Sequence, residues 1–469
     1  MASEETPLLV SEAAQQKAHD ALYDRFSRSQ KRAIVAVVSW AGLLPFFVSG
    51  SFVPSIPQIA RDFDSTGAVI NLAVSLSILT TALANLLWAR YSSFYGRRPI
   101  YLFSYPFLCI GSLGVASARD VTELMSWRIV QAFGASSGMS TGAAVIGDIY
   151  RLEERGTAMG VFFAACLLGP ALAPLAGGLA AHYASWRVMQ LALFLAGLSA
   201  WISVLLLLPE TVQPDSQGLP RYLREKGKEV NSWVWVWLNP FKSLWLLRSP
   251  NVLAVTLAGT FVLMTDFVLL TPLAYTVGVR YNIKNEALIG AFFLPAGLGN
   301  VIGAPLGGNI SDRVVARWRK KRKGEWVPED RLRATYWGAL VLVPVSILLS
   351  GLVTQFVDGT PGIVLNLICL FVNGIGIDIV LSPSNAYYVD VLHRQSAEVI
   401  AASGAFRSII LAASTACVLP LINRIGVAAT DALAAAIAWL GFVLLWCTIR
   451  YGGKMRAWLD VGYSTIQDT

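Results

Sequence analysis

Residues 252–277 read VLAVTLAGTFVLMTDFVLLTPLAYTV and contain one charged residue, Asp266. A transmembrane helix needs about 20 consecutive, mainly apolar residues, so this run is long enough to cross a bilayer. Eleven further apolar stretches fill most of the chain: 33–53, 69–88, 100–116, 125–146, 158–181, 188–208, 287–306, 336–353, 363–381, 399–421 and 432–449. Hydrophobic residues make up 55% of the 469-residue chain and charged residues 14%. The sequence predicts an all-α membrane protein with twelve transmembrane helices.

The distribution of basic residues predicts the orientation in the membrane. Only six of the 37 Lys and Arg residues lie in the loops that follow odd-numbered stretches, and Arg128 lies inside a stretch. Nearly all the others lie at the termini and in the remaining loops. Cytosolic segments collect Lys and Arg, so we expect both termini in the cytosol. The net charge of +8 then reflects topology and does not indicate a nucleic-acid surface.

A polar stretch divides the twelve spans into two sets of six. We expect a cytosolic N-terminal tail at 1–32, a six-helix half at 33–208, a cytosolic central loop at 209–251, a second six-helix half at 252–450 and a cytosolic C-terminal tail at 451–469. The central loop carries a cluster of tryptophans: Trp233, Trp235, Trp237 and Trp245. This cluster indicates either a segment lying along the inner leaflet or a simple linker.

A weak internal repeat relates the two halves. Residues 89–99 (ARYSSFYGRRP) form the expected cytosolic loop after the second span, and residues 308–317 (GNISDRVVAR) form the expected cytosolic loop after the eighth. In this alignment Ser93 matches Asp312 and Arg98 matches Arg317. Two related six-helix halves place a substrate site at their interface, near the membrane midplane.

Five motifs carry a resemblance to a known family. They are 96–99 (GRRP), 128–134 (RIVQAFG), 169–178 (GPALAPLAGG), 328–332 (PEDRL) and 382–390 (SPSNAYYVD). In order and on these spans, they resemble the motifs of the major facilitator superfamily, and in particular of its fungal twelve-span drug:proton antiporters. The chain departs from the family pattern at Ser93, where an acidic residue is usual, which weakens the expected gate in the first half.

The resemblance implies roles for two groups of motif residues. It places a cytosolic gate at Gly96, Arg97, Arg98, Asp312 and Arg313, because arginine offers several donors to carboxylates and helix ends. The alternative is that these arginines only anchor the topology. It also implies a kinked, tightly packed contact between the halves that suppresses leak, formed by the antiporter-type motif of the fifth span: Gly169, Pro170, Pro174, Gly177 and Gly178. Close packing of small residues alone would also explain the glycines.

Charged residues inside spans are costly and usually functional. The resemblance implies that Arg128 is part of proton coupling or a structural bridge to the substrate cavity; the alternative is that it snorkels outward. Asp266 could carry a proton or bind a cationic substrate, since a buried carboxyl group binds a proton more readily than an exposed one. Asp378 could carry a proton or pair with Arg407.

Uncharged side chains within spans complete the candidate site. Asn300 is expected to take part in substrate or proton coupling. Other polar and aromatic residues are candidates for lining a central cavity, among them Asn71, Ser75, Asn373 and Trp40.

The expected function is secondary active transport, as proton-coupled efflux of small organic molecules such as drugs, polyamines or metabolites by alternating access. A proton symporter, an uptake carrier and an organic-acid exporter remain alternatives, and a non-transporting receptor or enzyme is the rival class. No Walker-type loop or metal-ligand spacing occurs, so we expect no cofactor, no metal and no enzymatic activity. The expected partners are the substrate, protons and the lipid bilayer.

The location follows from short signals. Residues 4–9 (EETPLL) fit an acidic dileucine pattern that a sorting adaptor could bind. We therefore expect a multi-pass protein of the vacuolar or the plasma membrane. The resemblance implies a monomer, which is the default for this fold.

Overall fold

The structure is a computed structural model that describes residues 25–150, 152–212, 218–225, 236–283, 285–325, 327–392 and 396–458. These residues are almost entirely helical and include no strand. The candidate sorting segment at 4–9, Trp233, Trp235 and the C-terminal tail beyond Trp458 lie outside the described residues.

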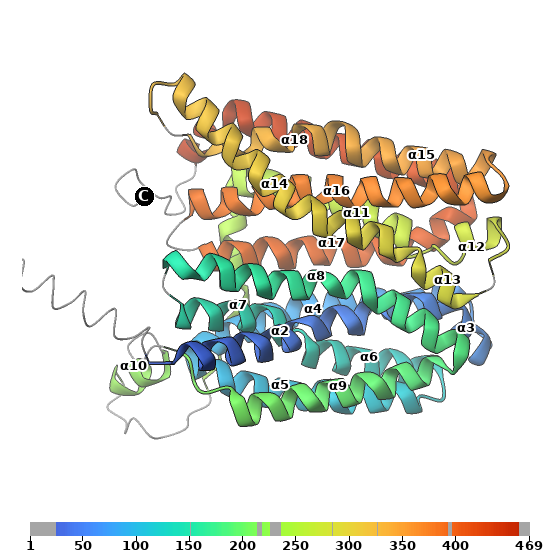
Figure 1. The fold of residues 1–469 in the computed structure, drawn as a ribbon, viewed down its shortest axis with the longest axis horizontal. Coiled ribbons are helices and arrows are strands. Elements are labelled where there is room, and N and C mark those ends of the chain that lie inside the picture. Colours follow the sequence, from blue (N-terminus) through green and yellow to red (C-terminus); the bar gives the residue numbers. More distant parts are fainter. Residues whose placement is uncertain are drawn as a thin grey trace, which may run out of the picture.

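The first half is a bundle drawn in blue to green in Figure 1. Its elements are α2 (Arg28–Gly50), η1 (Val53–Ser55), α3 (Ile56–Asp62), α4 (Gly67–Tyr95), α5 (Arg97–Ser117), α6 (Val121–Ala135), α7 (Ser137–Ile149), α8 (Leu152–Tyr183) and α9 (Trp186–Leu207). Side chains define several starts. Thr66 accepts a hydrogen bond from the Val69 amide at the start of α4, and Asp120 accepts one from the Glu123 amide at the start of α6, as N-caps do.

The second half follows a central segment and is drawn in yellow to red (Figure 1). The central segment holds α10 (Gly218–Glu225) and η2 (Pro240–Arg248). The half itself comprises α11 (Pro250–Leu270), α12 (Val277–Arg280), α13 (Glu286–Ala291), α14 (Phe293–Lys321), η3 (Pro328–Thr335), the π-helical turn η4 (Gly338–Leu342), α15 (Val343–Phe356), α16 (Gly359–Val391), α17 (Ser396–Ile425) and α18 (Val427–Trp458).

Eleven helical stretches in the described part of the chain are long and apolar enough to span a membrane. The remaining span expected from the sequence, 125–146, is formed by two successive helices, α6 and α7, which meet at Ser136. Small residues at this junction allow close packing. A Cβ on Gly134 would overlap the backbone of α5 at Leu108, and one on Gly138 would lie 2.5 Å from the carbonyl oxygen of Ala41 on α2. The all-α membrane fold predicted from the sequence is therefore confirmed.

The ends of the helices define two sides of the molecule. Helix α2 begins and α18 ends on one side, which we call the tail side (Figure 1). The opposite side, which we call the distal side, carries α3, α12 and α13. On the tail side α14 continues to Lys321, so Asp312 and Arg313 lie on a helix. The prediction that they belong to a loop is wrong, because the polar tail-side turns of α14 continue its hydrogen-bonded ladder beyond the apolar span.

Three helix pairs join the halves: α8 with α13, α8 with α14, and α4 with α17. Asn71 Nδ2 on α4 donates to the Thr415 carbonyl oxygen on α17 at 2.5 Å, and Ser75 Oγ donates to the Ala412 carbonyl oxygen. Both polar side chains are buried. They therefore hold the halves together, and the expectation that they line a cavity is not met in this structure.

Apolar side chains also cover the outside of the bundle. Leu195 and Leu206 on α9 are 61% and 73% exposed, and Phe103 on α5 is 55% exposed. Trp40 is partly exposed and donates to Ser199 Oγ on α9. An apolar exterior of this extent fits a lipid environment and not water.

Candidate functional site

The first half carries a cluster of hydrogen bonds around Arg97 on the tail side. Arg97 Nε lies 3.0 Å from Asp148 Oδ2 at the end of α7. Its Nη1 donates to Ser92 Oγ at 2.8 Å and to Ser93 Oγ at 3.3 Å. Arg97 therefore joins the end of α4 and the start of α5 to the end of the fourth span.

Glu210 fixes the start of α5 at the same place. Its carboxylate accepts hydrogen bonds from the backbone amides of Arg97 at 3.0 Å and Arg98 at 3.2 Å, and a helix N-terminus favours such a negative charge. Gly96 permits this approach, because it has φ +111° and a Cβ there would lie 2.5 Å from Glu210 Oε2. Arg98 Nη2 donates to the Leu205 carbonyl oxygen at 2.9 Å. Gly96, Arg97 and Arg98 thus belong to one network of hydrogen bonds at the tail-side end of the first half.

The second half repeats the arrangement with Arg331 in place of Arg97. Arg331 Nε donates to Asp390 Oδ2 at 2.6 Å, and Asp390 lies near the tail-side end of α16. Its Nη1 donates to Asp312 Oδ1 at 3.1 Å. Arg313 is exposed and makes no hydrogen bond or ion pair with any described residue. Asp312 is therefore placed at the contact, whereas Arg331 holds the place that the sequence analysis gave to Arg313.

The two clusters differ at one aligned position. Arg97 meets the neutral hydroxyl of Ser93 in the first half, whereas Arg331 meets the carboxylate of Asp312 in the second. Arg98 aligns with Arg317 in the sequence repeat, but the contacts relate Arg97 to Arg331. Arg331 lies outside the repeat segment 308–317, so aligning the two repeat segments could not identify it as the counterpart of Arg97. The sequence feature that pointed to Arg331 was its place in the 328–332 motif.

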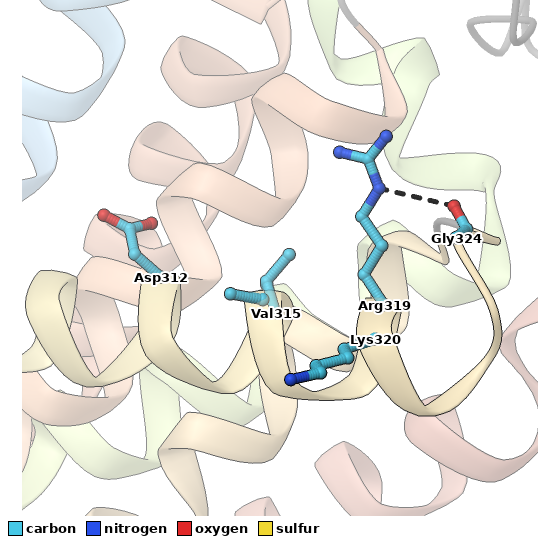
Figure 2. Close-up of a pocket in the computed structure, with 6 residues that line it drawn as sticks. Asp312, Val315, Arg319, Lys320 and Gly324 are labelled. Atoms are coloured by element: carbon cyan, nitrogen blue, oxygen red, sulfur yellow. Dashed lines mark hydrogen bonds between the residues drawn. The ribbon is translucent and has the colours of Figure 1, made fainter.

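A groove of about 450 Å³ lies beside Asp312 on the tail-side end of α14 (Figure 2). It is also lined by Val315, Arg319, Lys320 and Gly324, and Arg319 Nε donates to the Gly324 carbonyl oxygen at 3.3 Å. The groove lies outside the apolar part of α14, so it does not correspond to the midplane substrate site expected from the sequence.

Ion pairs join the halves on both sides. On the tail side, Arg90 Nη1 lies 3.6 Å from Glu398 Oε1, which links α4 to α17. On the distal side, Glu286 of α13 contacts Arg61 Nη2 at 3.0 Å and His182 Nδ1 at 3.3 Å. The distal contact is shorter and engages both oxygens of one carboxylate.

Helix α8 packs against both α2 and the second half through small residues. A Cβ on Gly169 would overlap Phe46 of α2, and one on Gly177 would overlap the Ser51 carbonyl group. A Cβ on Gly178 would overlap the Glu286 backbone of α13.

The prolines of the same motif lie within α8, which continues past both of them. Pro174 lies at the contact with α13, where a Cβ on Gly290 would overlap its carbonyl oxygen, and Pro170 is half-buried one turn earlier. The motif residues therefore meet both α2 and the second half along one helix.

Arg128 on α6 is completely buried. Its Nη1 donates to the Val48 carbonyl oxygen and to Gln131 Oε1, each at 2.9 Å, and its guanidinium carbon lies 4.4 Å from the centre of the Phe52 ring. The alternative that Arg128 snorkels outward is wrong. Its Nε and Nη2 have no hydrogen-bond partner among the described residues, so two buried donors are left for an acceptor.

Asp266 lies on α11 and Asp378 on α16, two helices that pack against each other. Both side chains are partly accessible. Neither makes a hydrogen bond or ion pair with another residue in the described ranges, and the alternative that Asp378 pairs with Arg407 is not met there. The two carboxyl groups are therefore without a fixed partner in that part of the chain.

Asn300 lies on α14 beside the same part of α16. Its Oδ1 is buried without a partner in the described structure, and it would lie 2.9 Å from a Cβ on Gly374. One turn further along each helix, a Cβ on Gly303 would lie 3.1 Å from the Asp378 Cβ. Asn373, by contrast, bonds to Thr265 and Ser346 within the second half and is buried.

Comparison with known proteins places this arrangement in a family. The sequence model of the Major Facilitator Superfamily matches residues 38–415. Citrate exporter 1 of Aspergillus niger is 24% identical, with 92% of this chain and 88% of that protein covered. Efflux pump radE of Floropilus chiversii is 27% identical, with coverages of 90% and 80%. MFS antiporter QDR3 of Candida albicans is 21% identical, with coverages of 92% and 79%.

Solved structures share the fold. The partially occluded inward-open xylose transporter XylE from E. coli superposes with a TM-score of 0.65 at 15% identity, covering 93% of this chain and 99% of that chain. The human organic anion transporter MFSD10 gives a TM-score of 0.56 at 18% identity, with coverages of 88% and 99%.

Proposed function

The chain belongs to the major facilitator superfamily, and we propose that it is a secondary transporter that exports a small organic molecule in exchange for protons. The two six-helix halves at 33–208 and 252–450 would rock against each other and expose the site between them to each side in turn. Relatives named as an exporter, an efflux pump and an antiporter support this direction of transport.

The observation that carries the proton-coupling part is the pair formed by Asp266 and Asp378. A carboxyl group without a fixed cationic partner, held inside a membrane protein, is suited to bind and release a proton. Because α11 and α16 pack against each other, a charge on one carboxyl group would influence proton binding at the other. Asn300, with an unpartnered Oδ1 beside Asp378, would hydrogen-bond a protonated group or the substrate.

The Arg97 and Arg331 clusters would keep the tail-side ends of the two halves rigid beside the gate. Each arginine holds the segment before one span to the end of the next span within its own half, so each six-helix half keeps its shape while the halves move. The Arg90–Glu398 pair would break when the tail side opens, and the Glu286 contacts when the distal side opens. The α8 motif would keep the closed contact tight enough to prevent leak.

The tail side would face the cytosol. Most Lys and Arg residues lie at the termini and in the loops on that side, as the positive-inside rule requires. The membrane would be vacuolar if an adaptor binds the 4–9 segment and the plasma membrane otherwise, and the protein would act as a monomer with no enzymatic activity of its own.

A second candidate function is export of organic anions. Two unpartnered donors on Arg128 favour a carboxylate over a cation, and one relative is named as a citrate exporter. In this case Arg128 would hold the substrate, while Asp266 and Asp378 would still couple transport to protons.

The test measures proton flux into proteoliposomes that contain the purified protein. A pH gradient is imposed across the membrane, and a pH dye inside the proteoliposomes reports the flux. Citrate, spermidine and tetraphenylphosphonium would be added separately. We expect one of them to trigger proton movement, and its charge identifies the substrate class. Transport of a radiolabelled probe without any proton movement would reject proton coupling.

A further inference from the structure

A second polar region lies at the distal end of the second half, apart from Asp266 and Asp378. It is a small cavity of about 10 Å³ between α11, α15, α16 and α18, which is about the space that one water molecule needs. Asp431, near the start of α18, lines it and is only 3% exposed. The carboxylate makes no hydrogen bond or ion pair with any residue that the structure describes.

The hydroxyl donors that line the cavity are already used. Ser350 Oγ donates to Asn366 Oδ1 at 2.7 Å, and Thr354 Oγ1 donates to the same oxygen at 3.3 Å. Thr276 Oγ1 donates to the Pro272 carbonyl oxygen at 3.2 Å. These hydroxyl groups can therefore offer only oxygen lone pairs to a ligand.

Asn366 does not supply a donor either. Its Nδ2 donates to the Gly362 carbonyl oxygen at 3.1 Å and to the Tyr281 hydroxyl at 3.4 Å. A buried carboxylate surrounded by acceptors has nothing to balance its charge, and an unbalanced buried charge is very costly. The composition of the cavity selects against an anion and for a cation.

No cationic side chain is among the residues that line the cavity. Asp431 is the one titratable residue among them, and the others are apolar or uncharged. The nearest basic residue in sequence to the α11 wall, Arg280, pairs with Asp358 at 2.7 Å and donates to the Gln355 carbonyl oxygen. Tyr281 does not line the cavity, and its hydroxyl accepts a hydrogen bond from Asn366 and donates to the Val357 carbonyl oxygen at 3.0 Å.

We propose that Asp431, together with the hydroxyl oxygens of Ser350 and Thr354, forms a binding site for one small monovalent cation, either a proton or Na⁺. Hard cations take oxygen ligands of these kinds, and the cavity has room for one ion or one water. The site is separate from the Asp266–Asp378 pair and goes beyond the proposed proton-coupled efflux. A cation there would tie α18 to α15 at the distal side.

The test measures thermal stability, so it does not depend on transport. The full chain, purified in detergent, carries Asp266→Asn and Asp378→Asn so that those two carboxyl groups do not contribute. Tm is recorded while NaCl replaces choline chloride at constant ionic strength, and separately while the pH is lowered through the neutral range. A ligand that binds only the folded state raises Tm as its concentration rises.

Asp431→Asn should remove the dependence of Tm on the bound cation. If the background shows a Na⁺-dependent rise in Tm that Asp431→Asn loses, the bound cation is Na⁺. If Na⁺ has no effect and Asp431→Asn loses a rise in Tm on acidification, the bound cation is a proton. Thr354→Val keeps the carboxylate and should shift the response to higher cation concentration. The matched control is Asp64→Asn, which changes an exposed distal residue whose φ of 47° Asn tolerates; it should respond like the background.

The proposal is overturned if Asp431→Asn responds to Na⁺ and to pH as its background does. If Asp431→Asn does not yield folded protein, Thr354→Val provides the test. A Tm response of Thr354→Val to Na⁺ and to pH that equals the response of the background overturns the site. Because the readout is Tm in a background without the two central acids, failure of proton-coupled efflux would leave the result intact.

Discussion

Arg331 Nε lies 2.6 Å from Asp390 Oδ2, although 59 positions separate the two residues in the chain. The pair joins the segment before the ninth span to the end of the tenth. Arg97 and Asp148 form the corresponding pair between the third and fourth spans at 3.0 Å. Both halves thus close their tail-side ends with one arginine and one aspartate.

Arg331→Gln should destabilise the protein by about 1–3 kcal/mol, between the values typical of exposed and of buried ion pairs. The substitution leaves Asp390 and Asp312 without their arginine, and the Arg331 and Asp390 side chains are each less than one-fifth exposed. Chemical denaturation or Tm measures the loss. Arg313→Gln, on an exposed helix face, is the control and should stay within about 0.5 kcal/mol of the parent. Equal effects of the two variants would contradict the assignment of Arg331.

Ser93→Asp should strengthen the tail-side contact of the first half. The new carboxylate would replace a neutral partner that lies 3.3 Å from Arg97 Nη1. Because the site is exposed, we expect a gain of no more than about 1 kcal/mol, which high salt should reduce. Tm measured at low and high salt tests this. Ser93→Asn controls for size, and a gain of the same magnitude in that variant would show that charge is not the cause.

Gly178→Leu should separate α8 from α13, since even a Cβ at this position would overlap the Glu286 backbone. Overpacking of this kind costs about 1–3 kcal/mol, and the loosened contact should raise proton leak across proteoliposomes without substrate. Gly404→Leu is the control, because nothing lies within 4 Å of a Cβ there. A Gly178→Leu protein that is as stable as the parent and leaks no more protons would contradict the proposed role of α8.

Glu286→Gln should open the distal side more often, because it removes the carboxylate that contacts Arg61 and His182 of the other half. Hydrogen–deuterium exchange of the α3 and α13 amides should become several times faster. Asp358→Asn also breaks an exposed distal ion pair, but within the second half alone. Faster exchange of α3 and α13 in both variants would show that the effect is not specific to the contact between halves.

The fold could be predicted from the sequence because apolar length is a local property. Each span needed only its own residues, and the structure contains helices at all twelve places. The junction at Ser136 and the extension of α14 past Asp312 were not predicted. Both depend on packing and on helix continuation beyond the membrane, which hydropathy does not report.

The candidate site could be predicted only in part. Asp266, Asp378 and Arg128 were found because a charge inside an apolar run is conspicuous. Asp431 was not predicted because it directly precedes the apolar stretch 432–449. An acidic residue in that position is typical of the protein surface. The burial of Asp431 depends on α15, which packs against α18 so closely that a Cβ on Gly351 would lie 2.8 Å from the Asp431 Cβ. Asp148 and Asp390 were not predicted as the ion-pair partners of Arg97 and Arg331, because only the fold brings each arginine close to its aspartate.

The central claim is that Asp266 and Asp378 couple substrate movement to protons. The most direct test is proton flux triggered by the identified substrate in proteoliposomes carrying Asp266→Asn, Asp378→Asn or the control Asp64→Asn. We expect the first variant to lose coupled proton movement at least tenfold, the second to reduce it, and the control to match the parent. Proton movement per substrate that is unchanged when both aspartates are replaced together would contradict the account.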